Sequence, residues 1–130
     1  MERINERIQV AKKALHTLEE LVDKASVTTI ERDAAIQRFQ YTFEATWKAA
    51  QLYLREQEGL ESGSPKGVIR ASWQSGLLTE ADARQALVMT DDRNLTVHTY
   101  NESLAKTLYS HLASYAQITR KWLEGISNRI

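Results

Sequence analysis

Residues 104–126, LAKTLYSHLASYAQITRKWLEGI, carry large apolar side chains at steps of three and four residues. The mean step is about 3.6 residues, the period of an α-helix. A helix that is apolar along one face must bury that face against other elements, so this stretch predicts a long helix in a helical core. The apolar positions are Leu104, Leu108, Leu112, Tyr115, Ile118, Trp122 and Ile126.

The same period occurs in two stretches upstream. Thr28 and Glu31 have the spacing of a capping box, in which hydroxyl and carboxylate each satisfy an exposed backbone amide, and they predict the start of the second helix. We expect the first helix to end near Lys24 and the second to stop before the loop-like residues 58–67. The two stripes are Ile4, Ile8, Ala11, Leu15, Leu18 and Val22, and then Ile36, Phe39, Phe43, Trp47, Ala50 and Leu54.

Two further helices are predicted between residues 65 and 94. Pro65 suits the first turn of a short helix that ends near Trp73, because its fixed φ and missing amide cost nothing at that position. Thr79 precedes a helical segment that runs toward Asn94, and its hydroxyl is a typical N-cap group. These segments, added to the three apolar stripes, give four substantial helices and one short one.

We therefore expect residues 1–130 to form one domain, an all-α, antiparallel up-and-down four-helix bundle with one additional short helix. Only 5 glycines and 1 proline occur in the chain, which favours helix. Seventeen basic and 17 acidic residues cancel, so no overall field attracts nucleic acid or an anionic membrane. Any anion site must be local.

Cysteine is absent, which excludes disulfides, thiolate nucleophiles and cysteine metal sites and is compatible with a reducing cytoplasm. The first ten residues, MERINERIQV, are charged from the second position and lack the apolar core of a signal peptide. No apolar run approaches the roughly 20 residues that span a bilayer. We expect a cytoplasmic protein without a membrane segment.

Residues 91–102, DDRNLTVHTYNE, concentrate polar groups between the last two predicted helices. In a continuous helix Arg93 and His98 would lie roughly 140° apart and could not address one ligand. Thr99 and Glu102 again have capping-box spacing, so the final helix is predicted to begin at Tyr100 after a turn that folds Arg93 back toward His98. Starts with Asp92 or Asn101 as the cap remain alternatives.

Such a turn would place His98 and Tyr100 at a helix N-terminus, where free amides and the helix dipole favour a phosphate. A neutral imidazole can take a proton from a ribose 2′-hydroxyl, while arginine stabilises the charge that builds on the phosphate oxygens. The alternative is that Arg93, His98 and Tyr100 only satisfy backbone carbonyls and a carboxylate such as Asp91 or Asp92. The residues alone indicate no more than a phosphate site.

The segment RNLTVHTY, residues 93–100, resembles the R-x4-H-x-Y motif of the HEPN superfamily. The chain is similar to the branch that contains HepT toxins and nucleotidyltransferase substrate-binding proteins, over about residues 30–115. The stretches AIQRFQYTFEATWKAAQLYL, SPKGVIRASWQSGLL and RNLTVHTYNESLA carry this likeness in the order and spacing of that branch.

The resemblance implies a helical bundle that forms a homodimer, so that two copies of the motif line one cleft. It implies an RNA-cleaving toxin that needs no metal or cofactor, and a separately encoded small nucleotidyltransferase as antitoxin. Carried onto this chain, Arg93 would bind the scissile phosphate, His98 would act as acid or base, Asn94 would help to orient it, and Tyr100 would accept an AMP group. That group would put bulk and charge where the RNA phosphate should lie.

Glu44 and Lys48, one helical turn apart, also resemble the family's pattern. They are expected either to support the cleft or to form a solvent-exposed ion pair. Asp92 is expected to support the cleft as well. His16 and His111 lack a second metal ligand at suitable spacing and are interpreted as structural.

Two other functions remain open. One is a non-catalytic subunit that presents a nucleotide or substrate to the transferase, and the other is an interaction bundle without a ligand.

Overall fold

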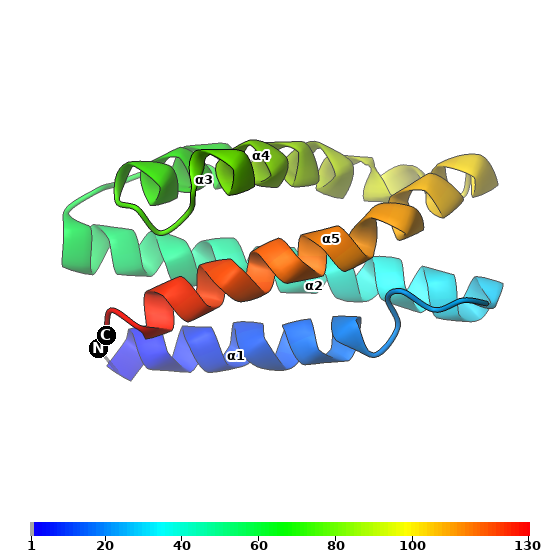
Figure 1. Cartoon of the computed structure of the whole chain (residues 1–130), viewed down its shortest axis with the longest axis horizontal. Coiled ribbons are helices and arrows are strands. Elements are labelled where there is room, and N and C mark those ends of the chain that lie inside the picture. Colours follow the sequence, from blue (N-terminus) through cyan, green and yellow to red (C-terminus); the bar gives the residue numbers. More distant parts are fainter. Residues whose placement is uncertain (1) are drawn as a thin grey trace.

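The computed structural model describes residues 2–130, and these contain five α-helices and no strand. A π-helical turn, Leu54–Glu58, extends α2, and a short 3-10 turn, Thr96–His98, follows α4. Figure 1 shows α1, α2, α4 and α5 alternating in direction along the bundle, with the short α3 beside α4. The predicted all-α, antiparallel up-and-down bundle with one additional short helix is confirmed. The helices are α1 (Glu2–Glu19), α2 (Thr29–Tyr53), α3 (Pro65–Gln74), α4 (Glu80–Leu95) and α5 (Glu102–Ser127).

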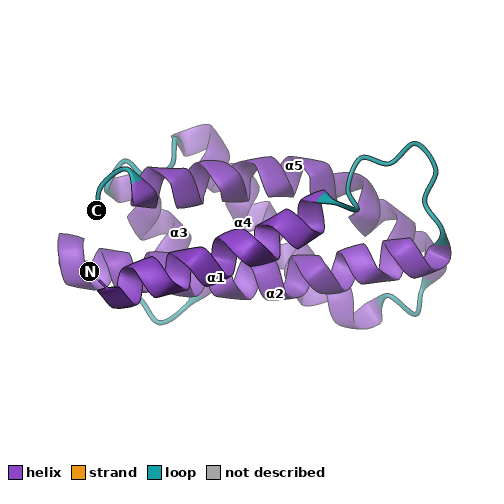
Figure 2. Cartoon of the chain, turned by 90° about the horizontal axis from the view of Figure 1, so that it is seen from below, coloured by secondary structure: helices purple, strands orange, loops and turns teal. Residues whose placement is uncertain are grey.

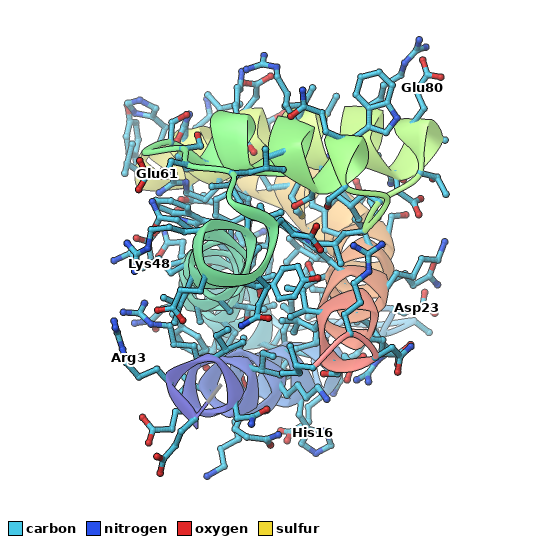
Figure 3. The ribbon with its side chains drawn as sticks, turned by 90° about the vertical axis from the view of Figure 1, so that its left-hand side faces the viewer. Arg3, His16, Asp23, Lys48, Glu61 and Glu80 are labelled. Atoms are coloured by element: carbon cyan, nitrogen blue, oxygen red, sulfur yellow. The ribbon has the colours of Figure 1, made fainter. Side chains whose placement is uncertain are left out.

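The core lies between these helices, and α2 contacts α1, α3, α4 and α5. Trp122 of α5 is 0% exposed, and its indole Nε1 donates a hydrogen bond of 3.0 Å to the hydroxyl of Ser72 in α3. This bond satisfies a buried polar group that would otherwise destabilise the fold. Figure 3 looks along the bundle and shows charged side chains such as Lys48 and Glu80 projecting outward.

Figure 2 shows the connections gathered at the two ends of the bundle. Side chains cap α2, α3, α4 and α5 at their first residues. The capping box at Thr28 is confirmed: its hydroxyl accepts from the amide of Glu31, and the Glu31 carboxylate accepts from the amide of Thr28, each at 3.0 Å. The N-cap role of Thr79 and the position of Pro65 in the first turn of α3 are confirmed as well. Within residues 2–130, no helix is long and apolar enough to cross a bilayer.

The predicted end of the first helix near Lys24 is wrong, because α1 ends at Glu19. The amide of Leu21 bonds to the carbonyl of Leu18 at 3.0 Å, which tightens the chain into a turn. Asp23 then adopts a left-handed conformation with φ 58°, which a right-handed helix cannot contain.

Candidate phosphate site

The predicted break between α4 and α5 is present, but its cap is Asn101 and not Thr99. The side chain of Asn101 accepts from the amide of Leu104 at 3.1 Å, and α5 begins at Glu102. Thr99 has ψ 0°, whereas an N-cap residue needs an extended backbone, and its hydroxyl instead donates to the carbonyl of Thr96 at 3.0 Å. The alternative start at Asn101 was therefore correct, and the Thr99 capping box was wrong.

Because α5 begins at Glu102, His98 and Tyr100 lie before the helix and not among its N-terminal amides. Tyr100 is 85% exposed. Its ring lies edge-on to the imidazole of His98 at 5.9 Å, with its hydroxyl 3.4 Å from Nδ1. The joint itself is fixed by buried Thr96, which accepts a hydrogen bond of 2.6 Å from Gln40 Nε2 and donates one of 2.6 Å to the carbonyl of Arg93.

Arg93 extends from the last turn of α4 toward α2. Its guanidinium lies over the ring of Phe43, 4.9 Å from the centroid, and Nη1 is 3.6 Å from Glu44 Oε2. Its Nε is buried and has no hydrogen-bond acceptor within residues 2–130. The aromatic face therefore orients the guanidinium, while much of its donor capacity remains unused.

Glu44 is the carboxylate beside Arg93. It accepts a hydrogen bond of 3.0 Å from Trp47 Nε1 and lies 3.2 Å from Lys48 Nζ. Burial alone would raise the pKa of Glu44, but the hydrogen bonds from Trp47 and Lys48, with the charges of Lys48 and Arg93, lower it below its ordinary value. Glu44 is therefore ionised at neutral pH and anchored on α2 independently of Arg93.

An open pocket of about 430 Å³ lies between α2 and the end of α4. The structure brings Arg93, Asn94 and Glu44 together in its lining and leaves His98 and Tyr100 outside. No hydrogen bond joins Arg93 to His98 among the described residues. The lining residues are Gln40, Tyr41, Glu44, Arg93, Asn94, Thr96 and Val97.

Asp92 faces α5, away from this pocket. Its Oδ2 accepts hydrogen bonds from the hydroxyl of Tyr115 at 2.5 Å and from Nδ1 of His111 at 3.0 Å. Burial, followed by the hydrogen bond to Asp92, raises the pKa of Tyr115 well above its ordinary value, so the hydroxyl keeps its proton. Asp92 thus joins α4 to α5 and does not line the pocket, contrary to expectation. His111 serves this structural pair.

A row of aromatic rings connects Asp92 to Arg93 through the core. Tyr115 stacks on Phe39 at 5.6 Å, and Phe39 meets Phe43 at 6.3 Å, beneath the guanidinium of Arg93. The sequence predicted these rings as core residues, but their contact with Arg93 depends on how α2 and α4 pack. Asp91, which the alternative interpretation offered as a carboxylate for Arg93, His98 and Tyr100 to satisfy, instead pairs with Lys66 at 2.7 Å.

The match to a family covers nearly the whole chain. Residues 6–128 match the family described as nucleotidyltransferase substrate binding protein like, and the chain belongs to this family. None of the curated proteins compared with the chain matches it significantly.

Solved structures share the fold of this chain. A protein from Thermus thermophilus is 57% identical with a TM-score of 0.87, over 89% of this chain and 98% of that one. The tri-AMPylated Shewanella oneidensis HEPN toxin, solved in complex with its MNT antitoxin, is 19% identical with a TM-score of 0.78, over 96% of each chain. A Haemophilus influenzae protein with the fold of a substrate binding domain of a nucleotidyltransferase is 21% identical with a TM-score of 0.79, over 92% of this chain and 98% of that one. The HEPN fold inferred from the resemblance is confirmed.

Proposed function

We propose that this chain is the toxin of a toxin–antitoxin pair and a metal-independent endoribonuclease that acts in the cytoplasm. The observation that carries the proposal is the guanidinium of Arg93, held over Phe43 in an open pocket with unused donors and an unpaired Nε. Arginine presents a planar fork that matches two phosphate oxygens, so this arrangement suits an RNA phosphate. Asn94 in the same pocket would orient that phosphate.

Glu44 does not block such binding. The 3.6 Å separation between Arg93 and Glu44 is longer than a charge-assisted hydrogen bond, whereas Trp47 and Lys48 hold the carboxylate at 3.0 and 3.2 Å. Arg93 can therefore turn toward a phosphate without leaving Glu44 unpaired. The cost of losing a half-exposed ion pair is about 0–1 kcal/mol.

His98 would act as the acid or base. It would take the proton of the ribose 2′-hydroxyl while that oxygen forms a bond to phosphorus. The bond from phosphorus to the 5′-oxygen then breaks, leaving a 2′,3′-cyclic phosphate, and a second imidazole returns a proton to the departing 5′-oxygen. Arg93 would stabilise the charge on the phosphate oxygens during the reaction.

A homodimer would supply that second imidazole. Within one chain His98 does not line the pocket of Arg93, so the site is complete only if a second copy contributes its motif. Leu95 and Val97 lie within the motif, between Arg93 and His98, and are 40% and 71% exposed. Such apolar groups gain stability when a partner covers them. We infer that two copies meet at this end of the bundle.

Tyr100 would be the modification site of a separately encoded nucleotidyltransferase antitoxin. Its hydroxyl reaches solvent and contacts only His98 among the described residues. In the transfer, the tyrosyl oxygen would bond to the α-phosphorus of ATP, lose its proton and release pyrophosphate. The AMP group would then place bulk and negative charge beside His98 and oppose the entry of RNA.

Incubation of the purified chain with single-stranded RNA in buffer containing EDTA tests this function. We expect cleavage that leaves 2′,3′-cyclic phosphate ends, and no cleavage of the matching DNA, which lacks the 2′-hydroxyl. Intact RNA, or cleavage that EDTA abolishes, would contradict the proposal.

The second candidate is a non-catalytic subunit that presents a nucleotide to the transferase. The zero net charge and the pairing of Arg93 with Glu44 favour it, because many RNA-binding proteins carry a basic face. Co-expression with the transferase, followed by intact mass, separates the two. A toxin should gain the mass of AMP groups, and Tyr100→Phe should prevent this gain, whereas a binding subunit should keep its unmodified mass.

A further inference from the structure

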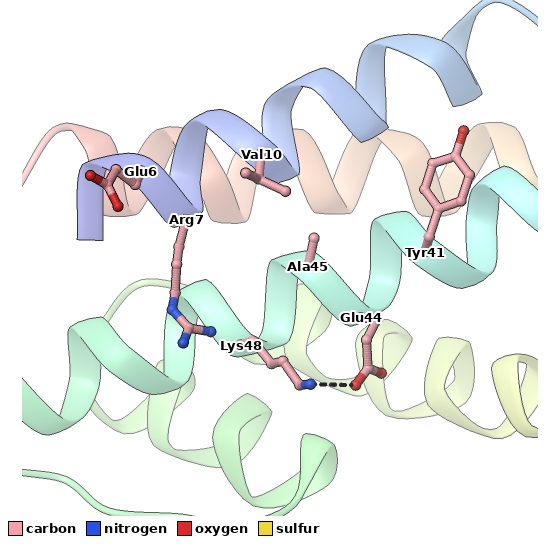
Figure 4. Close-up of a pocket in the computed structure, with 7 residues that line it drawn as sticks. All are labelled: Glu6, Arg7, Val10, Tyr41, Glu44, Ala45 and Lys48. Carbon is pink, nitrogen blue, oxygen red and sulfur yellow. Dashed lines mark ion pairs between the residues drawn. The ribbon is translucent and has the colours of Figure 1, made fainter. Parts of the chain in front are cut away.

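A second groove, between α1 and α2, adjoins the pocket of Arg93. It has a volume of about 440 Å³, within the range of roughly 300–1,000 Å³ that is typical of small-molecule sites. Tyr41 and Glu44 line both hollows, so the two adjoin on α2. We call it the α1–α2 groove, and Figure 4 shows its lining residues, Glu6, Arg7, Val10, Tyr41, Glu44, Ala45 and Lys48.

Two cations from different helices meet in this groove. Figure 4 shows Arg7 of α1 reaching across toward Lys48 of α2, while the carboxylate of Glu6 points away from the guanidinium. Arg7 forms no ion pair with any of residues 2–130. Lys48 pairs with Glu44 at 3.2 Å in an exposed, one-turn contact of the kind that adds only a few tenths of a kcal/mol in a helix. Arg7 can therefore turn to an anion, and Lys48 can bind the same anion from beside Glu44, which keeps its hydrogen bond of 3.0 Å from Trp47.

Tyr41 presents an aromatic surface to the same groove. Tyr41 is 43% exposed, so a large aromatic surface faces solvent. Its hydroxyl forms a hydrogen bond of 2.9 Å with the hydroxyl of Thr17 in α1. This bond fixes the ring, so little side-chain freedom remains to be lost when a ligand stacks on it. Val10 and Ala45 supply apolar surface farther along the groove, between Tyr41 and Arg7.

We propose that the α1–α2 groove binds the nucleotide next to the scissile phosphate in a single-stranded RNA. The base stacks on Tyr41, and the adjacent phosphate lies between Arg7 and Lys48. An aromatic platform combined with cations is how proteins hold single-stranded nucleic acid without reading its sequence. This inference rests on the proposed function, because it extends the path of the RNA from the Arg93 pocket.

The spacing along α2 fits such a path. Tyr41 and Lys48 are seven residues apart, or about 10 Å along the helix, and of the two only Tyr41 also lines the pocket of Arg93. A strand that leaves Arg93 therefore meets the aromatic ring before it reaches the cations. The overall charge of zero is no obstacle, because these cations act locally on a bound phosphate.

Fluorescence anisotropy with a labelled single-stranded RNA tests the groove in the His98→Ala full-length chain, which keeps the RNA uncut. We expect Tyr41→Ala to weaken binding about 5- to 100-fold, the loss associated with one base stack, and Tyr41→Phe to retain most of the affinity. Arg7→Gln combined with Lys48→Gln should reduce the slope of log K against log salt by about 0.7, because one phosphate contact is lost from a single strand.

Lys13→Gln is the control, since it removes one cation from α1 outside the groove and should leave the slope unchanged. The groove assignment is overturned, while the proposed function stands, if the His98→Ala chain binds RNA and neither further change alters that binding. In that case Tyr41→Ala would leave the affinity unchanged, and Arg7→Gln with Lys48→Gln would leave the salt dependence unchanged. If the His98→Ala chain does not bind RNA at all, both are overturned.

Discussion

The two joints at one end of the bundle carry the same sequence pattern, a threonine followed three residues later by glutamate, yet they fold differently (Figure 1). At the first, Thr28 is extended, with ψ 162°, and forms a complete capping box with Glu31. At the second, Thr99 has ψ 0°, and Asn101 caps α5 instead. The spacing permits a capping box, but the backbone conformation of the threonine decides whether it forms.

The difference has a functional consequence. At the first joint the polar groups bond to each other, and Lys24 adds a bond of 2.8 Å to Glu31. At the second, Thr96 holds the backbone, and His98 and Tyr100 remain exposed. The first joint therefore closes a helix and nothing more, whereas the second presents side chains that can reach a substrate.

The largest expected difference concerns the arginine beside each joint. Arg93→Gln should lower RNA cleavage about 100- to 1,000-fold, the usual loss when a group that stabilises transition-state charge is removed. Arg38→Gln, at the first joint, removes a hydrogen bond of 2.7 Å to the carbonyl of Thr17. It should cost about 1 kcal/mol of stability and leave the cleavage rate unchanged. Initial rates of RNA cleavage and urea unfolding measure the two effects. Equal cleavage rates for Arg93→Gln and Arg38→Gln would contradict the claim that only the second joint is the chemical site.

Asp92 should matter for stability. Asp92→Ala leaves the hydroxyl of Tyr115, which is 4% exposed, without its acceptor, and should lower the free energy of unfolding by about 1–3 kcal/mol. Tyr115→Phe removes the hydroxyl donor and leaves Asp92 in place. It should lower the free energy of unfolding by less than Asp92→Ala does, because His111 can still donate to Asp92. Urea denaturation checks the order, and an Asp92→Ala chain as stable as wild type would show that the contact contributes nothing.

The caps give a smaller effect. Thr28→Ala and Asn101→Ala should each destabilise the chain by about 1 kcal/mol, because each removes an acceptor for a free helix amide. Thr99→Ala should cost less than Asn101→Ala, since its hydroxyl bonds only to a carbonyl within the turn. Thermal unfolding of the three variants provides the measurement. The opposite order for residues 99 and 101 would mean that Thr99 caps α5 after all.

The smallest effect is a pH dependence at the first joint. The hydrogen bond from Lys24, with those from the amide and hydroxyl of Thr28, lowers the pKa of Glu31 from 4.5 to about 2. Its stabilising contribution is therefore complete above pH 4.5 and is lost as the pH falls toward 2. Glu31→Gln should flatten the decline of the melting temperature in that window. Because the group is exposed, salt should reduce the difference, and identical curves for both chains would refute it.

Local patterns predicted most of the fold. The apolar stripe of α5, the cap at Thr28 and the proline in the first turn of α3 depend on residues within a few positions, and all are confirmed. The end of α1 was missed because Asp23 takes a left-handed conformation that no apolar period reveals. Thr99 was misassigned because its spacing says nothing about its ψ angle.

The site was less predictable because its contacts join distant segments. Resemblance singled out Arg93, but its position over Phe43 requires α2 and α4 to pack side by side. Asp92, next to Arg93 in sequence, points to α5 because successive residues on a helix lie about 100° apart. Tyr41 was overlooked, since nothing in the sequence distinguishes an exposed ring in a groove from a buried one.

RNA cleavage by His98→Ala, compared with His16→Ala, tests the central claim that the second joint is the chemical site. His16 is the exposed imidazole in the last turn of α1, beside the first joint, so its replacement is a matched control. In EDTA buffer, His98→Ala should lose cleavage by about 100- to 10,000-fold, the typical contribution of a general acid or base, while His16→Ala cuts at the wild-type rate. Cleavage by His98→Ala at the wild-type rate would contradict the account.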